Sequence, residues 1–436
     1  MSSRTRILFT AILILIFADL TVASGSSPNR PGKISSGDPA IAARTFRLGK
    51  ASEVELKLTA SAPGTSWGAK GAEAAVVTCQ VDGRYNHDII LYMGADEFAY
   101  NVLLGDLTAG PHRLEVRLNK TQSAIQATSV KIRNIVIRPV HLPDDPDGIA
   151  AAHAPILFAR PNSIGKYTDI PLLMWCEVFK NGDGTKNIRY SYVFTNEDAG
   201  TATEALMARW GRATDIEWAY EIKLKGAEVV EEMFQAVNHQ STAFKGKHDG
   251  AHPILIVASD NNNFADGGES AMKFRFVPEP VDLSSHSREE LMDRHPWTYR
   301  LMAEELYREG KISEAGGHQI RDPREYIYIE ANAPKANMGI DLKVEMADGA
   351  SFDSSMGNQY LRITRPGWFR VAIRLPQNES PAGARRISLD CAPPSAKKND
   401  PPPDCSGVVV QKVFILSNDY SPQASNAEID STSGHK

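Results

Sequence analysis

Short apolar or alternating segments, each ended by Gly, Asp or Pro, recur through most of this chain and constrain its fold more than any other feature. Alternation with a period of two places every second side chain on one face of a strand. Between residues 45 and 140 such segments follow one another closely, which is typical of a β-sandwich. These segments are 46–48, 54–58, 76–81, 89–92, 100–104, 112–118 and 130–137.

Further regions follow this predicted sandwich. Residues 139–148 are rich in Pro and Asp and predict a linker, because proline cannot continue a sheet ladder. Residues 150–275 carry long alternating segments that predict a central sandwich. Residues 285–312 have a helical period interrupted at Pro296, which predicts two short helices. Residues 325–420 return to strands, and residues 421–436 form a polar tail. The expected fold class is therefore mostly β, with two or three β-sandwich units and a short helical insertion.

The first residues have the pattern of a secretory signal peptide, predicted to span residues 1–24. Arg4 and Arg6 precede an apolar run from Ile7 to Leu20, and small residues at 21–24 offer a cleavage site. The run is short for a membrane span, and no later segment is long and apolar enough to be one. Residues 25–44 have the composition of a flexible leader. We therefore expect a secreted or periplasmic protein without a transmembrane segment.

Charge and cysteine content narrow the partners and the covalent structure. The formal net charge of −5 gives no basic footprint, so we do not expect nucleic acid as a partner. Cys391 and Cys405 bracket a proline-rich loop that cannot pack by itself, which predicts a disulfide; the alternative is two thiols at strand ends. Cys79 and Cys176 lie in apolar runs, and we expect each to be buried rather than joined to the other.

One predicted strand of the first region carries a resemblance. The segment Gly110-Pro-His-Arg-Leu-Glu-Val-Arg-Leu118 resembles the late strand of galactose-binding-like and carbohydrate-binding-module sandwiches, and so does the closing segment 130–137. The resemblance implies a galactose-binding-like β-sandwich over residues 45–140. It also implies carbohydrate or a glycoconjugate as a partner.

Acidic side chains gather in the middle of the chain. Asp215 and Glu217 are two residues apart on a predicted strand, so both carboxylates point to one face. Glu197 and Asp198 end the preceding predicted strand, which can pair beside it. Several carboxylate oxygens at one strand mouth suit a hard divalent cation such as Ca²⁺ or Mg²⁺. The alternative is a solvated acidic edge paired with nearby arginines.

The same stretch resembles two known families. Its motif is similar to the central motif of the family named after vacuolar protein sorting protein sixty-two and, more distantly, of the necrosis-inducing cytolysin-like proteins. The resemblance is carried by Tyr190-Ser-Tyr-Val-Phe-Thr-Asn-Glu-Asp198, Gly211-Arg-Ala-Thr-Asp-Ile-Glu217 and His252-Pro-Ile-Leu-Ile-Val-Ala258. It implies an acidic cleft in the middle region, with Asp198, Asp215, Glu217 and Glu197 as metal ligands.

The sequence departs from these families just before Asp215. Arg212 and Thr214 stand where the families have histidines, so Arg212 places a positive charge where a metal ligand is expected. His248, Asp249 and His252 lie at the next predicted strand, where a histidine can supply the missing imidazole; the alternative is that both histidines are loop and strand-start residues. The candidate ligand-binding residues are therefore Arg212, Asp260 and His252.

Three functions remain open from the sequence. The resemblance favours an exported glycan- or glycoconjugate-binding protein, cation-assisted at the acidic cleft, because the cytolysin-like proteins recognise glycosylated lipid headgroups. The second is a secreted polysaccharide hydrolase or lyase that uses paired carboxylates such as Glu197 and Glu217. The third is a structural protein of the cell surface.

Overall fold

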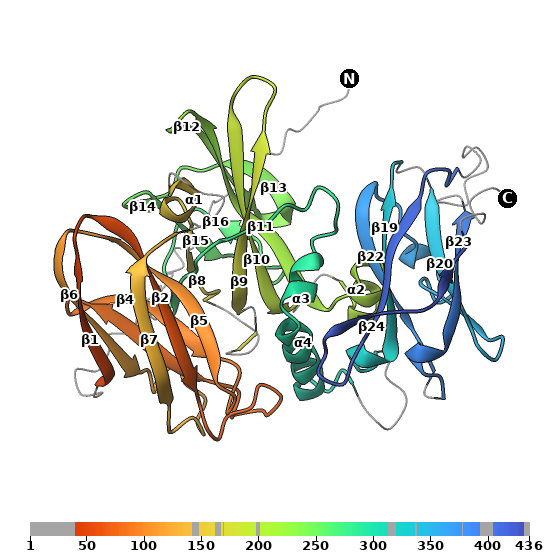
Figure 1. Ribbon diagram of the computed structural model, residues 1–436, viewed down its shortest axis with the longest axis horizontal. Helices are drawn as coiled ribbons and strands as arrows, with labels where there is room; N and C mark the ends of the chain where they lie inside the picture. The colour runs from red at the N-terminus through yellow and green to blue at the C-terminus, as the bar shows by residue number, and fades with distance from the viewer. Residues whose placement is uncertain are drawn as a thin grey trace, which may run out of the picture.

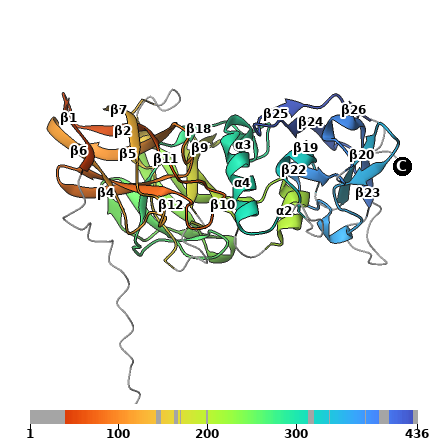
Figure 2. The same ribbon diagram turned by 90° about the horizontal axis from the view of Figure 1, so that it is seen from below.

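The computed structural model describes residues 40–141, 148–161, 167–168, 170–197, 201–312, 320–335, 338–376, 378–392 and 404–430. Strands dominate these residues and the helices are few and short, which confirms the predicted fold class. One sandwich lies at each end of an elongated molecule, with a large sheet and two helices between them (Figure 1). The view from below shows the same order along the long axis (Figure 2). The predicted signal peptide lies outside the described residues.

The N-terminal sandwich consists of two sheets, with strand orders β1-β6-β3-β4 and β5-β2-β7. Leu56 and Leu58 of one sheet and Val76 and Val77 of the other lie in one buried core, so the sheets pack face to face as the alternating pattern predicts. The strands are β1 Ala40–Leu48, β2 Ser52–Ser61, β3 Ala75–Val81, β4 Arg84–Leu91, β5 Phe98–Leu107, β6 Gly110–Leu118 and β7 Lys131–Pro139.

The middle of the chain forms one eleven-stranded sheet, ordered β17-β8-β15-β16-β12-β11-β10-β9-β18, with β13 on β12 and β14 on β15. The sequence predicts a sandwich over this region, whereas the pairing joins its strands into a single sheet; the domain boundaries stay a prediction. On β10, Tyr190, Tyr192 and Phe194 share one face and are buried in the core of this sheet.

This region contains α1 Ile149–Ala152, β8 Ile156–Phe158, β9 Pro171–Lys180, β10 Lys186–Asn196, α2 Thr203–Trp210, β11 Thr214–Lys225, β12 Glu228–Ala236, η1 Val237–His239, β13 Gln240–Ala243, β14 His248–Asp249, β15 His252–Val257, β16 Phe264–Ala265, β17 Lys273–Arg275 and β18 Glu279–Pro280.

Two helices, α3 Glu290–Arg294 and α4 Trp297–Arg308, follow the sheet and break at Pro296 as predicted. Helix α4 is anchored to the N-terminal sandwich, because Trp67 Nε1 donates to Glu305 Oε2 over 2.9 Å and the Arg308 guanidinium lies over the Trp67 ring. Among the residues that the structure describes, no helix has the length and apolar character that crossing a bilayer requires.

The C-terminal sandwich pairs sheets of order β22-β19-β24-β25 and β21-β20-β23-β26. Ile327 and Ile329 of one sheet share a buried core with Ile340 and Leu342 of the other. The elements are η2 Pro323–Glu325, β19 Tyr326–Ala333, β20 Gly339–Met346, β21 Ser351–Asp353, η3 Gln359–Leu361, β22 Gly367–Arg374, η4 Pro381–Gly383, β23 Ala384–Ala392, β24 Val409–Leu416, β25 Pro422–Ala424 and β26 Glu428–Ile429.

The cysteines behave as the sequence predicts. Cys391, in β23, forms a disulfide with Cys405, and the bridge closes the proline-rich segment that precedes β24. Cys79 in β3 and Cys176 in β9 are both buried and are not bonded to each other. The predicted disulfide is therefore confirmed.

Candidate functional site

The predicted acidic pair lies at the start of strand β11, where both side chains are almost completely buried. Asp215 Oδ2 accepts a hydrogen bond from Asn262 Nδ2 over 3.0 Å. Glu217 Oε2 accepts one from Gln235 Nε2 and lies 3.5 Å from His239 Nδ1. The pair therefore sits in a polar cluster completed by β12, the turn after it and the loop before β16.

The two carboxyl groups have pKa values shifted in opposite directions. Burial, and then the nearby charge of Glu217, raise the pKa of Asp215 to about 8. Burial alone would raise the pKa of Glu217 too, but the hydrogen bond with His239 and the charge of Arg288 lower it below its usual range. Glu217 in turn raises the pKa of His239. Burial thus favours the proton on Asp215, and the neighbours of Glu217 favour the negative charge there.

Glu197 belongs to the same electrostatic cluster. Its Oε1 accepts from the backbone N–H of Thr201 over 3.0 Å. Burial raises the pKa of Glu197, while the charge of Arg212 opposes this rise and that of Glu217 adds to it. The structure therefore brings Glu197, Asp215 and Glu217 together, and Asp198 lies outside the described residues.

Arg212 is buried, and its guanidinium group forms its hydrogen bonds inside the protein. Its Nε donates to Glu289 Oε1 over 2.9 Å, and Nη1 donates to the carbonyl oxygen of Thr214. Glu289 comes from the segment just before α3, which the sequence does not connect with this strand. Arg212 is thus held in an internal ion pair, and its charge still acts on the carboxyl of Asp215.

The other two predicted ligand-binding residues have different surroundings. His252 is buried at the start of β15, where Nδ1 lies 2.7 Å from the carbonyl oxygen of Ala154 and Nε2 lies 3.2 Å from Glu53 Oε2 of the N-terminal sandwich. Asp260 forms an ion pair with Arg160. His252 therefore joins the sheet to the sandwich, and the imidazole beside Glu217 is that of His239.

Four residues of the cluster were not identified from the sequence: Gln235, His239, Asn262 and Arg288. His239 and Asn262 have left-handed backbone, with φ of 57° and 47°. Non-glycine residues seldom adopt this conformation outside special turns. The run of polar residues from Ser259 to Asn263 is a visible signal in the sequence, but its partner on β11 is not.

A crevice of about 360 Å³ opens between the N-terminal sandwich, strand β9 and the start of α4. Aromatic rings line it. Trp297 stacks on Tyr92 with ring centroids 5.3 Å apart, and Phe98 meets Trp297 edge-on at 5.2 Å. Tyr100 packs against both Tyr92 and Phe98. The sequence does not predict this aromatic group, because its members come from three separate segments: β5, the turn after β4, and α4.

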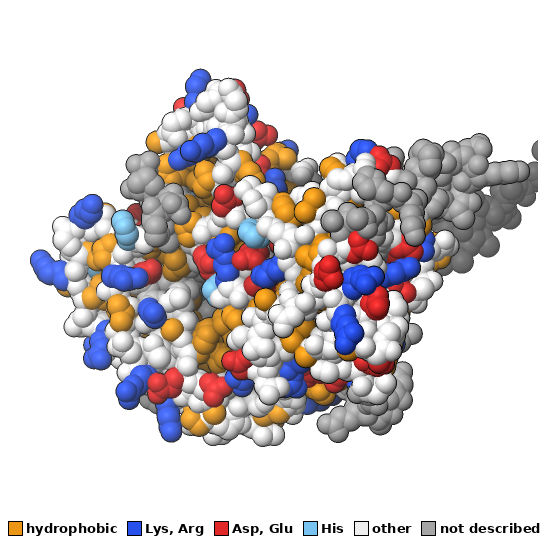
Figure 3. Space-filling view, turned by 45° about the vertical axis from the view of Figure 1, so that its right-hand side comes forward, with side chains coloured by type: hydrophobic (Ala, Val, Ile, Leu, Met, Phe, Trp, Pro, Cys, Tyr) orange, Lys and Arg blue, Asp and Glu red, His pale blue; other side chains and the backbone are white. Residues whose placement is uncertain are grey.

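Polar groups lie around these rings. His295 Nε2 and Glu279 Oε2 are 2.6 Å apart, and Arg138 forms an ion pair with Glu55. Asn101 is an exposed lining residue. On the face drawn in Figure 3, hydrophobic side chains gather below a group of acidic, basic and histidine side chains. The crevice thus combines an aromatic wall with hydrogen-bonding groups.

Comparisons with known proteins identify no family. No family model matches the chain, and no curated protein matches it. Several solved structures show local likeness; three of them, with TM-scores of 0.17 to 0.19, are described below, and such scores are too low to support an argument about function.

The first is the sugar-binding EclA C-terminal domain, with 19% identity over 28% of this chain and 84% of that domain, at a TM-score of 0.19. The second is a ruminal GH26 endo-beta-1,4-mannanase, with 10% identity over 27% of this chain and 26% of the enzyme, at 0.18. The third is a GH2 beta-galacturonidase from Eisenbergiella tayi, with 14% identity over 49% of this chain and 31% of the enzyme, at 0.17.

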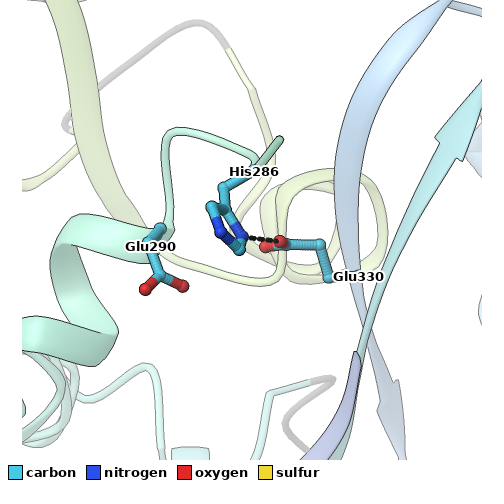
Figure 4. Close-up of side chains that lie close together, drawn as sticks. All are labelled: His286, Glu290 and Glu330. Carbon is cyan, nitrogen blue, oxygen red and sulfur yellow. Dashed lines mark hydrogen bonds and ion pairs between the residues drawn. The ribbon is translucent and has the colours of Figure 1, made fainter. Parts of the chain in front are cut away.

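A second group of potential metal ligands lies between α3 and the C-terminal sandwich. His286, Glu290 and Glu330 place one ligand atom each within 4.8 Å of one another (Figure 4). Arg370 already binds Glu330 over 2.7 Å, and Lys412 lies 3.4 Å from Glu290. Because these cations neutralise both carboxylates, the donor set does not fit a metal ion.

Proposed function

We propose that this protein binds carbohydrate, as free glycan or glycoconjugate, in the crevice between the N-terminal sandwich and α4. The observation that carries the proposal is the aromatic wall of Tyr92, Phe98 and Trp297 in a crevice that also presents polar side chains. A pyranose ring has an apolar C–H face and a rim of hydroxyl groups, so it needs both kinds of contact. Pockets at domain interfaces are also common ligand sites.

The size and chemistry of the crevice support a small saccharide. Its volume of about 360 Å³ lies at the lower end of the roughly 300–1,000 Å³ that ligand pockets occupy. The paired His295 and Glu279 offer a donor and an acceptor held in place by their mutual hydrogen bond. Two neighbouring hydroxyl groups of a sugar match such a pair.

Binding of the purified full chain to a panel of oligosaccharides, followed by calorimetry, tests the proposal. We expect Trp297→Ala to weaken binding at least tenfold, because it removes the stacking surface. Trp368→Ala is the matched control: Trp368 is an indole on β22 that donates to the carbonyl oxygen of Ser284 and is not a lining residue of the crevice. Asn101→Ala changes an exposed lining residue and tests the crevice without disturbing the aromatic packing. Full binding by both crevice variants would refute the site.

A divalent cation, Ca²⁺ or Mg²⁺, at Glu197, Asp215 and Glu217 remains part of this proposal. The raised pKa of Asp215 supports it, because a group of carboxylates that retains a proton to about pH 8 also gains from a bound cation. Arg212 and Arg288 oppose it. We expect Ca²⁺ or Mg²⁺ to raise the thermal midpoint of the wild type more at pH 8.5 than at pH 6, and not to raise that of Asp215→Asn. If neither cation changed the thermal midpoint of the wild type at either pH value, the proposed cation site would be refuted.

The opposite pKa shifts of Asp215 and Glu217 favour one alternative function, a polysaccharide hydrolase or lyase. A protonated carboxyl group beside an ionised one is the arrangement of a general acid and base. Release of reducing ends or unsaturated products from polysaccharides would reveal this activity. Glu217→Gln should abolish it while leaving saccharide binding in the crevice intact. If the protein bound saccharides but released no products, the enzymatic alternative would be refuted and carbohydrate binding would be the remaining function.

A further inference from the structure

Two arginines meet at Trp210, where α2 joins the C-terminal sandwich. The guanidinium carbon of Arg209 lies 4.8 Å from the centroid of the Trp210 ring, and that of Arg365 lies 5.0 Å from it. Arg365 comes from the loop before β22, and its Nη2 donates to the carbonyl oxygen of Arg209 over 2.5 Å. Two positive charges therefore lie against one aromatic ring where α2 contacts the C-terminal sandwich. We call this place, formed by Arg209, Trp210 and Arg365, the seam.

Both arginines have a buried N–H group that finds no acceptor among the described residues. These groups are Arg209 Nε and Arg365 Nη1. A buried donor without an acceptor destabilises the fold, and more so when it belongs to a charged group. An acceptor that entered the seam would satisfy these donors. The free energy recovered in this way would strengthen its binding.

Negative charge is scarce around these arginines. Within the described part of the chain, neither Arg209 nor Arg365 forms an ion pair with an acidic side chain. Glu289 is the acid whose charge favours ionised Arg365, and it is already hydrogen-bonded to Arg212. Burial, and then the charges of Arg209 and other arginines, lower the pKa of Arg365 to about 10.

Arg370, only five residues away in the same sandwich, also has a buried Nε without an acceptor among the described residues, but its charge is paired with carboxylates. It is completely buried and is bound 2.7 Å from both Asp293 and Glu330. Among the residues that the structure describes, the seam at Trp210 has no such pair of carboxylates in direct contact. Only the more distant charge of Glu289, which is already paired with Arg212, acts on Arg365.

We propose that this seam is a binding site for an oxyanion, a sulfate, phosphate or carboxylate group, held by Arg209 and Arg365. Planar guanidinium groups match the geometry of such anions, and stacking on Trp210 holds them in place at little further entropic cost. The site is distinct from the crevice, since neither arginine lines it. It therefore adds a second ligand chemistry that does not depend on carbohydrate binding in the crevice.

Sulfate is the probe that tests this site. The full chain is heated in increasing sodium sulfate and, separately, in sodium chloride at equal ionic strength. We expect sulfate to raise the thermal midpoint more than chloride does, and calorimetry to give a dissociation constant for one sulfate. Equal effects of the two salts would overturn the proposal.

Variants locate the bound anion. Arg365→Gln and Arg209→Gln should each weaken sulfate binding at least tenfold. Arg386→Gln is the control, because Arg386 is an exposed arginine of the same sandwich with only a 3.8 Å contact to Glu345. Without sulfate, Arg365→Gln should be at least as stable as the wild type, since it removes an uncompensated charge. Sulfate binding that both seam variants retain would refute the site.

The source of the oxyanion follows from a second titration. Glucose 6-sulfate is compared with inorganic sulfate and inorganic phosphate on the wild type and on Arg365→Gln. Tighter binding of the sugar sulfate, lost in the variant, identifies a substituted glycan as the ligand. Equal affinities, also lost in the variant, identify a free anion. Retention of all three ligands by the variant again contradicts the proposal.

Discussion

Asp215 and Glu217 lie two residues apart at the start of strand β11, and their pKa values are displaced in opposite directions. Glu217 is held ionised by His239 and Arg288, whereas the charge of Arg212 and the hydrogen bond from Asn262 do not offset the burial of Asp215, whose pKa is raised to about 8. Glu217 has the stronger hydrogen bonds and positive charges around it, so it is the carboxyl group that ionises more readily. Proton occupancy of the cluster depends on this pair.

The first prediction concerns the pH dependence of stability. Asp215 holds its proton to about pH 8 in the folded state, whereas its ordinary pKa is 3.8. Its contribution to the free energy of unfolding is therefore complete below about pH 4 and is lost as the pH rises through 8, at about 1.4 kcal/mol for each unit of pKa difference. Asp215→Asn cannot ionise, so it should lose less stability than the wild type between pH 5 and pH 9.

Urea unfolding at pH 5, 7 and 9 checks this expectation. Asp183→Asn is the matched control, because Asp183 is exposed and hydrogen bonds from Thr185 lower its pKa. Its titration lies below pH 5, so the variant should follow the wild type across the range. Parallel pH profiles for the wild type and Asp215→Asn would show that Asp215 is ionised throughout.

Local patterns in the sequence predict much of this fold. Every predicted strand of residues 45–140 overlaps a strand of the N-terminal sandwich, because the alternation of side chains reports burial directly. The break at Pro296 and the Cys391–Cys405 bridge were also predictable, since each depends on chemistry within a short segment. Strand β12 was missed, because only Phe234 and Gln235 of its nine residues are buried and the apolar period is weak.

Contacts between distant segments account for what the sequence did not predict. The pair Asp215 and Glu217 follows from the period of one strand, but the neighbours His239 and Asn262 approach it through turns with left-handed backbone. His252 looked like the imidazole of the site, yet its ring faces Glu53, almost two hundred residues earlier in the chain. No local pattern encodes such a meeting of segments.

The second prediction concerns the glycine that ends α2. Gly211 has a φ of +66°, and a Cβ there would lie 2.8 Å from Cγ of the fully buried Arg370. Gly310, after α4, has a φ of +70° and open space around it. Gly310→Ala should cost about 1 kcal/mol of unfolding free energy for its backbone alone. Gly211→Ala should cost at least about 2 kcal/mol more, because the side chain it meets cannot move away.

Chemical denaturation of both glycine variants separates the two effects. The backbone conformations are nearly the same, so the difference between the variants measures the contact with Arg370. Equal losses of stability would show that α2 moves away from β22 without cost.

The third prediction concerns the disulfide. Cys391 and Cys405 are 14 residues apart, and closing a loop of this length stabilises a fold by about 3 kcal/mol, chiefly by restricting the unfolded chain. The double variant Cys391→Ser/Cys405→Ser should lose about this amount in urea unfolding. A reductant should lower the stability of the wild type to the level of the variant and leave the variant unchanged. A wild type that reductant does not affect would contradict the expected contribution.

The last prediction concerns Arg370 itself. This arginine binds Asp293 and Glu330 at 2.7 Å and donates to Tyr299 at 2.8 Å, so it joins α3, α4 and β19. Arg370→Met would leave the buried Glu330 without this cation and Asp293 with Lys412 alone, and should cost about 3–5 kcal/mol at pH 7. Burial alone would raise the pKa of Asp293, but the charge of Arg370 lowers it below 3.8, so in the wild type this stabilisation is lost only as the pH falls below that value. In the variant the burial acts without the charge of Arg370, so the carboxyl groups take up protons more readily and the deficit should shrink toward pH 4.

Arg386→Met is the control for this loss. Arg386 is an exposed arginine 3.8 Å from Glu345, and such surface pairs contribute about 0–1 kcal/mol. Urea unfolding at pH 7 and pH 4 of both variants measures the difference between a buried and an exposed ion pair in one sandwich. If Arg370→Met were as stable as Arg386→Met at pH 7, the carboxylates of Asp293 and Glu330 would have to be protonated or solvated in the folded protein, and the ion pairs would not hold the helices to the C-terminal sandwich.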